Sequence, residues 1–129
     1  MEALDQTDGD IRAAQVTLIR QQNDAFRSSY GANFTIPGQV LLTPGVSGLS
    51  VWAQARVMVE VMTFNTFTED NDPHREHDFG AFEVEDAGET YRLFWKIDLY
   101  SNDLRGGSPE PSDLRVTTRV LTIMLRSEY

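Results

Sequence analysis

The sequence predicts an α+β fold in which two helices pack on an antiparallel sheet of three to four strands. Two observations predict it. The first half of the chain contains two stretches whose apolar residues recur at helical spacing, and the second half contains runs that alternate as half-buried strands do. The 129 residues, 40% of them hydrophobic, suffice for one core, so we expect a single domain over residues 1–129, with residues 1–8 flexible.

The first helix is predicted from Asp10 to about Ser28, with Thr7 or Asp8 as its cap. Polar and charged residues alternate with an apolar stripe at positions three and four apart, which is typical of a helix that covers a core. This stripe consists of Ile11, Ala14, Leu18, Ala25 and Phe26, widened by Val16 and Ile19.

A short apolar strand, residues 39–43, follows a loop rich in glycine and proline and ends at a predicted turn, Pro44-Gly45. The second helix is predicted over residues 51–64 with Ser50 as its N-cap. The stripe that we expect to face the core consists of Trp52, Ala55, Val59 and Met62, with Val51 and Met58 beside it.

Three further strands are predicted. Residues 79–85 and 91–100 form a hairpin around the tight turn EDAGE, and residues 116–125 form the last strand. In the middle strand, one face is expected to lie in the core and the opposite face to stay partly open. The expected core face consists of Tyr91, Leu93, Trp95, Ile97 and Leu99.

Charge is the most uneven property of the sequence. Eleven Lys and Arg stand against 20 Asp and Glu, and residues 69–89 alone hold nine acidic residues and one basic residue. Such a surface repels phosphates, so we expect no direct binding of nucleic acid. The absence of cysteine excludes disulfides and a cysteine nucleophile, and the acidic N-terminus is unlike a signal peptide. A cytoplasmic location and no membrane partner are therefore expected.

Four segments carry a resemblance to a known family: NDAFR from Asn23, FTEDNDPxxEHDFG ending at Gly80, FWKIDLY from Phe94, and TRVLTIMLRSEY from Thr118. They resemble the uncharacterised proteobacterial family called domain of unknown function three-seven-six-eight, which occurs in bacteria and in their plasmids and phages. The pair His74-Arg75 departs from the family pattern, which makes His77 the better candidate for a shared role.

One hypothesis for the acidic segment is recognition of a partner. A dense acidic face resembles a nucleic acid backbone and could occupy the basic groove of a protein. Since the resemblance implies carriage on mobile elements, it favours an inhibitor of a nucleic-acid-targeting host defence complex of the CRISPR or restriction type. This hypothesis needs no catalytic residue and no cofactor. Its expected contacts are Glu69, Asp70, Asp72, Glu76, His77, Asp78, Glu83 and Glu85.

The alternative from another class is a metal-dependent enzyme that acts on a phosphorylated or nucleotide substrate. Asp70, Asp72, His77 and Asp98 would hold a divalent cation, with Asn23 and Asp24 as further donors from another element. Glu76 would be the general base, and Lys96 or Arg119 would offset the phosphate charge. The sequence has neither a GxSxG motif nor a glycine-rich phosphate loop.

The third interpretation is structural. Asp and Asn side chains of DNDP would bond to nearby backbone N–H groups and hold an irregular loop, while His77 and Asp78 would pair with Arg119, Arg27 or Lys96. The sequence pattern leaves these three interpretations and the oligomeric state open, because side-chain orientation in an irregular loop has no period.

Overall fold

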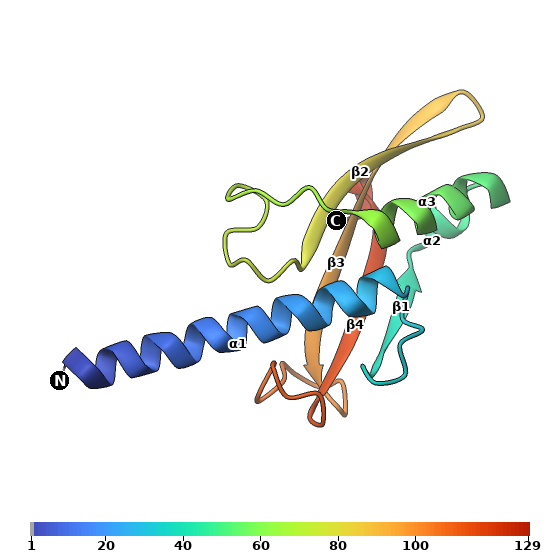
Figure 1. The fold of residues 1–129 in the computed structure, drawn as a ribbon. Coiled ribbons are helices and arrows are strands. Elements are labelled where there is room, and N and C mark those ends of the chain that lie inside the picture. Colours follow the sequence, from blue (N-terminus) through green and yellow to red (C-terminus); the bar gives the residue numbers. More distant parts are fainter. Residues whose placement is uncertain (1) are drawn as a thin grey trace.

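The elements follow one another along the chain in an order that confirms the predicted α+β class (Figure 1). The structure is a computed structural model that describes the backbone of residues 2–129 and the side chains of residues 7–129. Its elements are α1 (Glu2–Ser28), β1 (Gly38–Leu42), α2 (Pro44–Ser47), α3 (Val51–Thr63), β2 (Phe79–Asp86), β3 (Glu89–Ser101), β4 (Thr117–Leu125) and the 3-10 helix η1 (Arg126–Glu128). Each strand begins and ends within two residues of its predicted first and last residue.

The four strands form one sheet in the order β1-β4-β3-β2, with β4 and β3 in its centre. The pairs β2–β3 and β3–β4 are antiparallel, but β1 runs parallel to β4, with Val40 opposite Leu121. The prediction of a wholly antiparallel sheet is therefore wrong for this pair. Local patterns do not set the relative direction of strands so far apart, and the long connection between them is ample for a parallel crossover.

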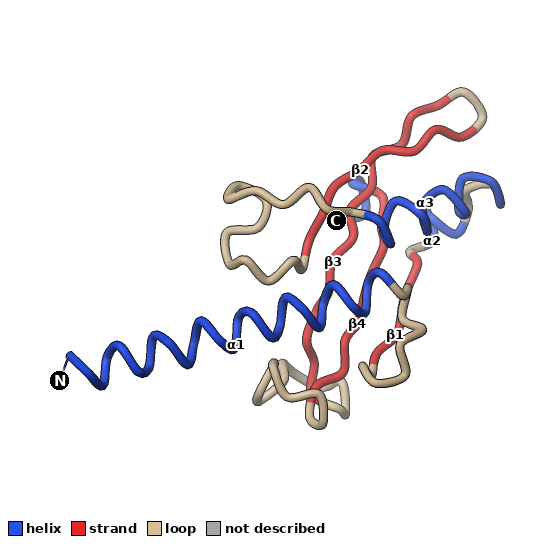
Figure 2. Tube along the Cα trace, in the orientation of Figure 1, coloured by secondary structure: helices blue, strands red, loops and turns tan. Residues whose placement is uncertain are grey.

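Both long helices lie on one face of the sheet, and the N-terminal half of α1 extends past the sheet edge (Figures 1 and 2). The Arg27 guanidinium of α1 lies 4.9 Å from the centre of the Trp95 ring, and Phe64, directly after α3, packs edge-on against the same ring. Within the described residues, no helix has the length and hydrophobicity needed to cross a membrane.

The core forms between this sheet face and the helices. Leu93, Trp95 and Ile97 of β3 are buried, as predicted for that face. A Cβ atom at Gly80 would lie only 2.3 Å from Trp95 Nε1, so the absence of a side chain there lets the indole lie directly against β2.

The opposite sheet face is partly open, as predicted. Tyr129 covers part of it by packing edge-on against Phe79 and Phe94, while the tyrosine itself stays 77% exposed. Met124 of β4, opposite Phe94, is buried on this side of the sheet.

Helix α1 differs from its prediction in its start and in its buried face. It begins at Glu2 rather than Asp10, so Thr7 and Asp8 lie inside the helix instead of capping it. The predicted flexibility of residues 1–8 includes Met1, which lies outside the described residues, and stays a prediction.

The predicted apolar stripe of α1 is confirmed for Ile19 and Phe26, which are buried, and is wrong for three of its other members. Ile11 and Leu18 are 53% and 45% exposed, and Ala14 is exposed as well. The buried positions are Ile19, Asn23, Phe26 and Arg27. Two of them are polar because this face meets the polar groups described below, so hydrophobic periodicity does not reveal it.

Helix α3 begins as predicted, since the Ser50 side chain accepts a hydrogen bond from Ala53 N. Its buried stripe, however, is Ala53, Val57 and Val61, on the side opposite to the predicted one. Trp52, expected in the core, is 86% exposed, and Met58 is 39% exposed. Because the helix is apolar on two sides, hydrophobic periodicity is compatible with either side being buried. The side that packs on the sheet is the one with the smaller side chains, Ala53, Val57 and Val61.

The predicted turn after β1 is a single helical turn, α2, with Pro44 at its first position. Glu128 of η1 fixes this turn to the end of β4. Its carboxylate accepts hydrogen bonds from the Thr43 hydroxyl at 2.6 Å and from Gly45 N at 3.0 Å.

Candidate functional site

The acidic loop between α3 and β2, residues 64–78, is ordered by its own side chains. Asp72 is 5% exposed, and its Oδ1 accepts hydrogen bonds from Glu76 N at 3.1 Å and His77 N at 3.2 Å. Asn71 Oδ1 accepts from Thr68 N at 2.8 Å. The structural interpretation of DNDP is therefore confirmed, and Asp72 faces inwards rather than towards a partner.

The same loop holds two residues in the left-handed backbone region, Arg75 at φ 58° and His77 at φ 53°. A residue with a side chain costs of the order of 1 kcal/mol or more in this region, so the rest of the loop must hold it there. Asp72 helps to hold the loop in this conformation, because its carboxylate accepts hydrogen bonds from the backbone N–H groups of Glu76 and His77.

His77 is held on three sides. Its Nδ1 lies 2.9 Å from both carboxylate oxygens of Asp24, and its Nε2 lies 3.6 Å from Asp72 Oδ2. The imidazole stacks on Phe67 with ring centres 3.7 Å apart. The predicted pairing of His77 with Arg119, Arg27 or Lys96 is wrong, because its partners are carboxylates from α1 and from its own loop.

These contacts belong to a polar cluster between α1, the acidic loop and β4, in which Asp24 and His77 are half-buried and the other members are buried: Asn23, Arg27, Asp72 and Arg119. Arg119 Nε of β4 donates to Asn23 Oδ1 at 2.8 Å, and Asn23 Nδ2 donates to the Glu76 carbonyl at 2.9 Å. The cluster thus joins α1, the acidic loop and the central strand β4.

Two arginines in the cluster are almost completely buried, and they differ in their partners. Arg27 pairs with Asp24 at 3.0 Å, and its Nη1 donates to the carbonyls of Val61 and Phe64 at 2.9 Å each. Burial lowers the pKa of Arg27, and Asp24 opposes that shift. Arg119 has no carboxylate in ion-pair distance among the described residues, and burial lowers its pKa to about 10.

Two carboxylates at the edge of the cluster resist ionisation. Burial raises the pKa of Glu76, and the nearby charge of Asp78 adds to the shift. Burial also raises the pKa of Asp78, with repulsion from Asp72 contributing. Burial, reinforced by repulsion between neighbouring carboxylates, thus disfavours the charged form of both groups.

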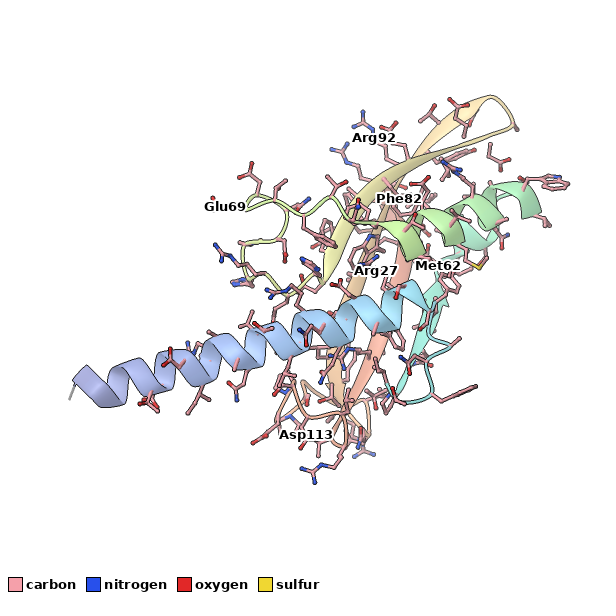
Figure 3. All side chains as sticks on the ribbon, viewed as in Figure 1. Arg27, Met62, Glu69, Phe82, Arg92 and Asp113 are labelled. Carbon is pink, nitrogen blue, oxygen red and sulfur yellow. The ribbon has the colours of Figure 1, made fainter. Side chains whose placement is uncertain are left out.

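The structure divides the eight predicted contact residues into three groups. Asp72 and His77 lie inside the cluster, and Glu76 and Asp78 are half-buried beside it. The exposed group consists of Glu69, Asp70, Glu83 and Glu85. In Figure 3, Glu69 points away from the sheet at the outer side of the loop, and Arg92, which pairs with Glu83 at 3.2 Å, lies on the hairpin.

The four ligands of the metal alternative do not converge. Asp72 and His77 meet, but Asp70 is exposed, and Asp98 pairs with Lys96 at 3.1 Å on the sheet face opposite to Trp95. No group of three or more His, Asp or Glu side chains in the described part of the chain could hold a metal ion.

A shallow hollow of about 390 Å³ opens beside His77. Its lining carries both signs of charge, so it has no clear preference for a charged ligand. The lining residues are Arg20, Phe67, Thr68, Glu69, Asp72, Arg75 and His77. Sequence reasoning missed Arg20, which donates to the Arg75 carbonyl at 3.2 Å, because nothing in its helical position marks it.

Comparison with known proteins places the chain in a family. No curated protein and no solved structure matches the chain. A family model matches residues 42–128, which include the acidic loop and the whole sheet except most of β1, while α1 lies outside the match. The resemblance to an uncharacterised family is thereby confirmed, and the chain belongs to the family described as Protein of unknown function (DUF3768).

Proposed function

We propose that the protein is a small non-enzymatic binding protein that docks onto a basic protein surface. The observation that carries this proposal is a set of exposed carboxylates on the acidic loop and on the β2–β3 hairpin, which we call the acidic face. The acidic face consists of Glu69, Asp70, Glu83, Glu85 and Glu89. Among the described residues, only Glu83 of this group forms an ion pair.

Two other acidic residues of the segment, Asp72 and Asp86, have structural roles. Asp72 is used to order its loop, and Asp86 accepts hydrogen bonds from Ser50 N and Oγ at the start of α3. Glu83 pairs with Arg92 and Glu89 accepts a hydrogen bond from the Tyr91 hydroxyl, whereas Glu69, Asp70 and Glu85 have no partner among the described residues. Grouped like charges repel one another, and a chain of net charge −9 adds to that field. A basic partner would relieve this repulsion and would be attracted over long range.

In its narrowest form, the proposal is that the acidic face imitates a nucleic acid backbone and blocks a nucleic-acid-targeting defence complex of the CRISPR or restriction type. The charge density of the segment supports this form, as does the carriage on mobile elements that the family resemblance implies. It requires that a DNA duplex compete with the protein for the same basic surface. The metal-dependent alternative gains no comparable support, because only two of its four ligands, Asp72 and His77, lie together in the described part of the chain.

The test uses an immobilised polylysine surface and two variants that each remove three negative charges. Glu69→Gln with Asp70→Asn and Glu85→Gln changes the acidic face, while Asp8→Asn with Asp10→Asn and Glu110→Gln changes exposed acids elsewhere. We expect the first variant to bind about tenfold more weakly than the second, and wild-type binding to weaken steeply with salt. Equal losses in both variants would overturn the proposal, because total charge would then explain the binding.

A further inference from the structure

The side of α3 that points away from the sheet is apolar along its whole length. We call it the outward face of α3: Val51, Trp52, Ala55, Met58 and Val59, all exposed, with half-buried Met62 at its end. Trp52 is 86% and Val51 79% exposed, opposite the buried stripe Ala53, Val57 and Val61. A helix that is apolar on two sides is typical of one that is covered on two sides.

The area of this face is of the size that an interface needs. A fully buried aromatic side chain removes 150–250 Å² from water, so Trp52 alone exposes about 200 Å². With its neighbours, the outward face exposes roughly 500 Å² of apolar surface, and pairing two such faces would bury about 1,000 Å², the size at which specific interfaces begin. Exposed aromatics of this kind are also the commonest anchors of interfaces.

We propose that the outward face of α3 is covered by a second copy of this chain, in a twofold dimer with the two α3 helices antiparallel. The charges that flank the face favour this occupant. Arg56 and Glu60 pair at 2.7 Å along one side of the stripe, one turn apart. An antiparallel twofold pairing places Arg56 opposite the partner subunit's Glu60, so the flank is complementary to itself.

The apolar residues fit the same arrangement. The small Ala55 lies near the middle of the helix, where it permits close approach of the two helix axes. Trp52 at one end lies opposite the partner subunit's Met62 at the other, a favourable contact between a thioether and an aromatic ring. A basic partner is not invoked for this face, because Glu60 on its flank already pairs with Arg56 and Asp86 at the start of α3 already accepts hydrogen bonds from Ser50.

This inference does not depend on the proposed docking function, and the two respond to salt in opposite ways. Two copies that each carry net charge −9 repel one another, so high salt should strengthen the dimer. High salt should weaken attachment of the acidic face to a basic surface. Failure of one proposal therefore leaves the other standing.

Sedimentation velocity over a concentration series at high salt tests the dimer. We expect the wild-type chain to be dimeric at the upper concentrations, and Trp52→Gln to stay monomeric throughout. Phe34→Gln is the matched control, because Phe34 is a fully exposed aromatic away from α3, and it should dimerise like the wild type. A monomeric wild type, or a Trp52→Gln variant that still dimerises, would overturn the proposal.

Charge reversal tests the antiparallel geometry. Arg56→Glu places two glutamates opposite each other and should weaken the dimer by about tenfold. Adding Glu60→Arg exchanges the two charges and should restore wild-type dimerisation, since the pair is exposed and contributes little to the monomer. A double variant as weak as the single one would exclude this arrangement.

Discussion

Both long helices bury apolar residues, but α1 also buries polar ones and α3 also exposes large apolar ones. Helix α1 buries Asn23 and Arg27 at 0% and 3% exposure, whereas α3 exposes Val51 and Trp52 at 79% and 86%. The difference shows that what a helix meets, and not its polarity alone, decides which side is buried. Helix α1 lies over the guanidinium of Arg119 and over the backbone of the acidic loop, so it needs polar partners there.

The polar helix also positions the apolar one. Arg27 donates hydrogen bonds to the carbonyls of Val61 and Phe64, which lie at the C-terminal end of α3, where helical carbonyls lack partners within the helix. A cation at this end also interacts favourably with the helix dipole. Burial of Arg27 thus stabilises the orientation in which α3 turns its outward face to solvent.

The largest effect is expected from Arg27→Ala. It leaves the carbonyls of Val61 and Phe64 without a donor and removes the guanidinium from the Trp95 ring, so we expect a loss of about 3–4 kcal/mol in the free energy of unfolding. Urea denaturation measures it. Arg56→Ala removes an exposed arginine from α3 as a control and should change stability by less than about 0.5 kcal/mol. Similar losses in both variants would show that the buried contacts of Arg27 do not contribute more to stability than an exposed arginine does.

Asp72→Ala should have the next largest effect. It removes the acceptor of two backbone N–H groups in a loop with left-handed residues, and we expect a loss of about 2–3 kcal/mol. The neighbouring exposed carboxylate offers a control, since Asp70→Asn should leave the melting temperature unchanged. If Asp72→Ala melts like the wild type, the loop does not depend on its internal hydrogen bonds.

A smaller effect concerns pH. Since the folded pKa values of Glu76 and Asp78 are raised, the native chain binds more protons than the unfolded chain between the ordinary carboxyl pKa and the raised value. The contribution of these two groups to the free energy of unfolding therefore falls as the pH rises through this range, and it stays constant at higher pH. Glu76→Gln should reduce this fall and stabilise the fold slightly at pH 7. Parallel pH profiles of the melting temperature for wild type and variant would contradict the assignment.

The smallest effect is expected from Trp52→Gln on the monomer. Because the indole is 86% exposed, its loss should change the free energy of unfolding by less than about 0.5 kcal/mol at dilutions where no dimer forms. Chemical denaturation of the dilute protein measures this. A loss of several kcal/mol would mean that Trp52 packs in the core, as its helical spacing suggests.

Features that depend on neighbouring residues could be predicted from the sequence. The hairpin follows from two alternating runs around a tight turn, the Trp95 face from strand periodicity, and the Ser50 cap from its residue type. The direction of β1 and the buried side of α3 could not be predicted, because each depends on a surface that forms elsewhere in the chain.

The candidate site divides in the same way. The role of Asp72 was open to prediction because its bonds reach only four and five residues along the chain. The partner of His77 could not be predicted, because Asp24 lies 53 residues away on a helix whose buried side is partly polar. Of the eight predicted contact residues, the exposed ones could not be told from the internal ones, because an irregular loop has no period.

The strand order has a consequence for how the chain folds. Strand β4 lies between β1 and β3, yet it comes after both in the sequence. On a translating ribosome, β1 emerges early and has no neighbour in the sheet until Thr117–Leu125 follows. The hairpin of β2 and β3 can form first, from local contacts, whereas closing the loop between Val40 and Leu121 is entropically expensive and slow. The sheet is therefore completed from its middle, by the strand that arrives last.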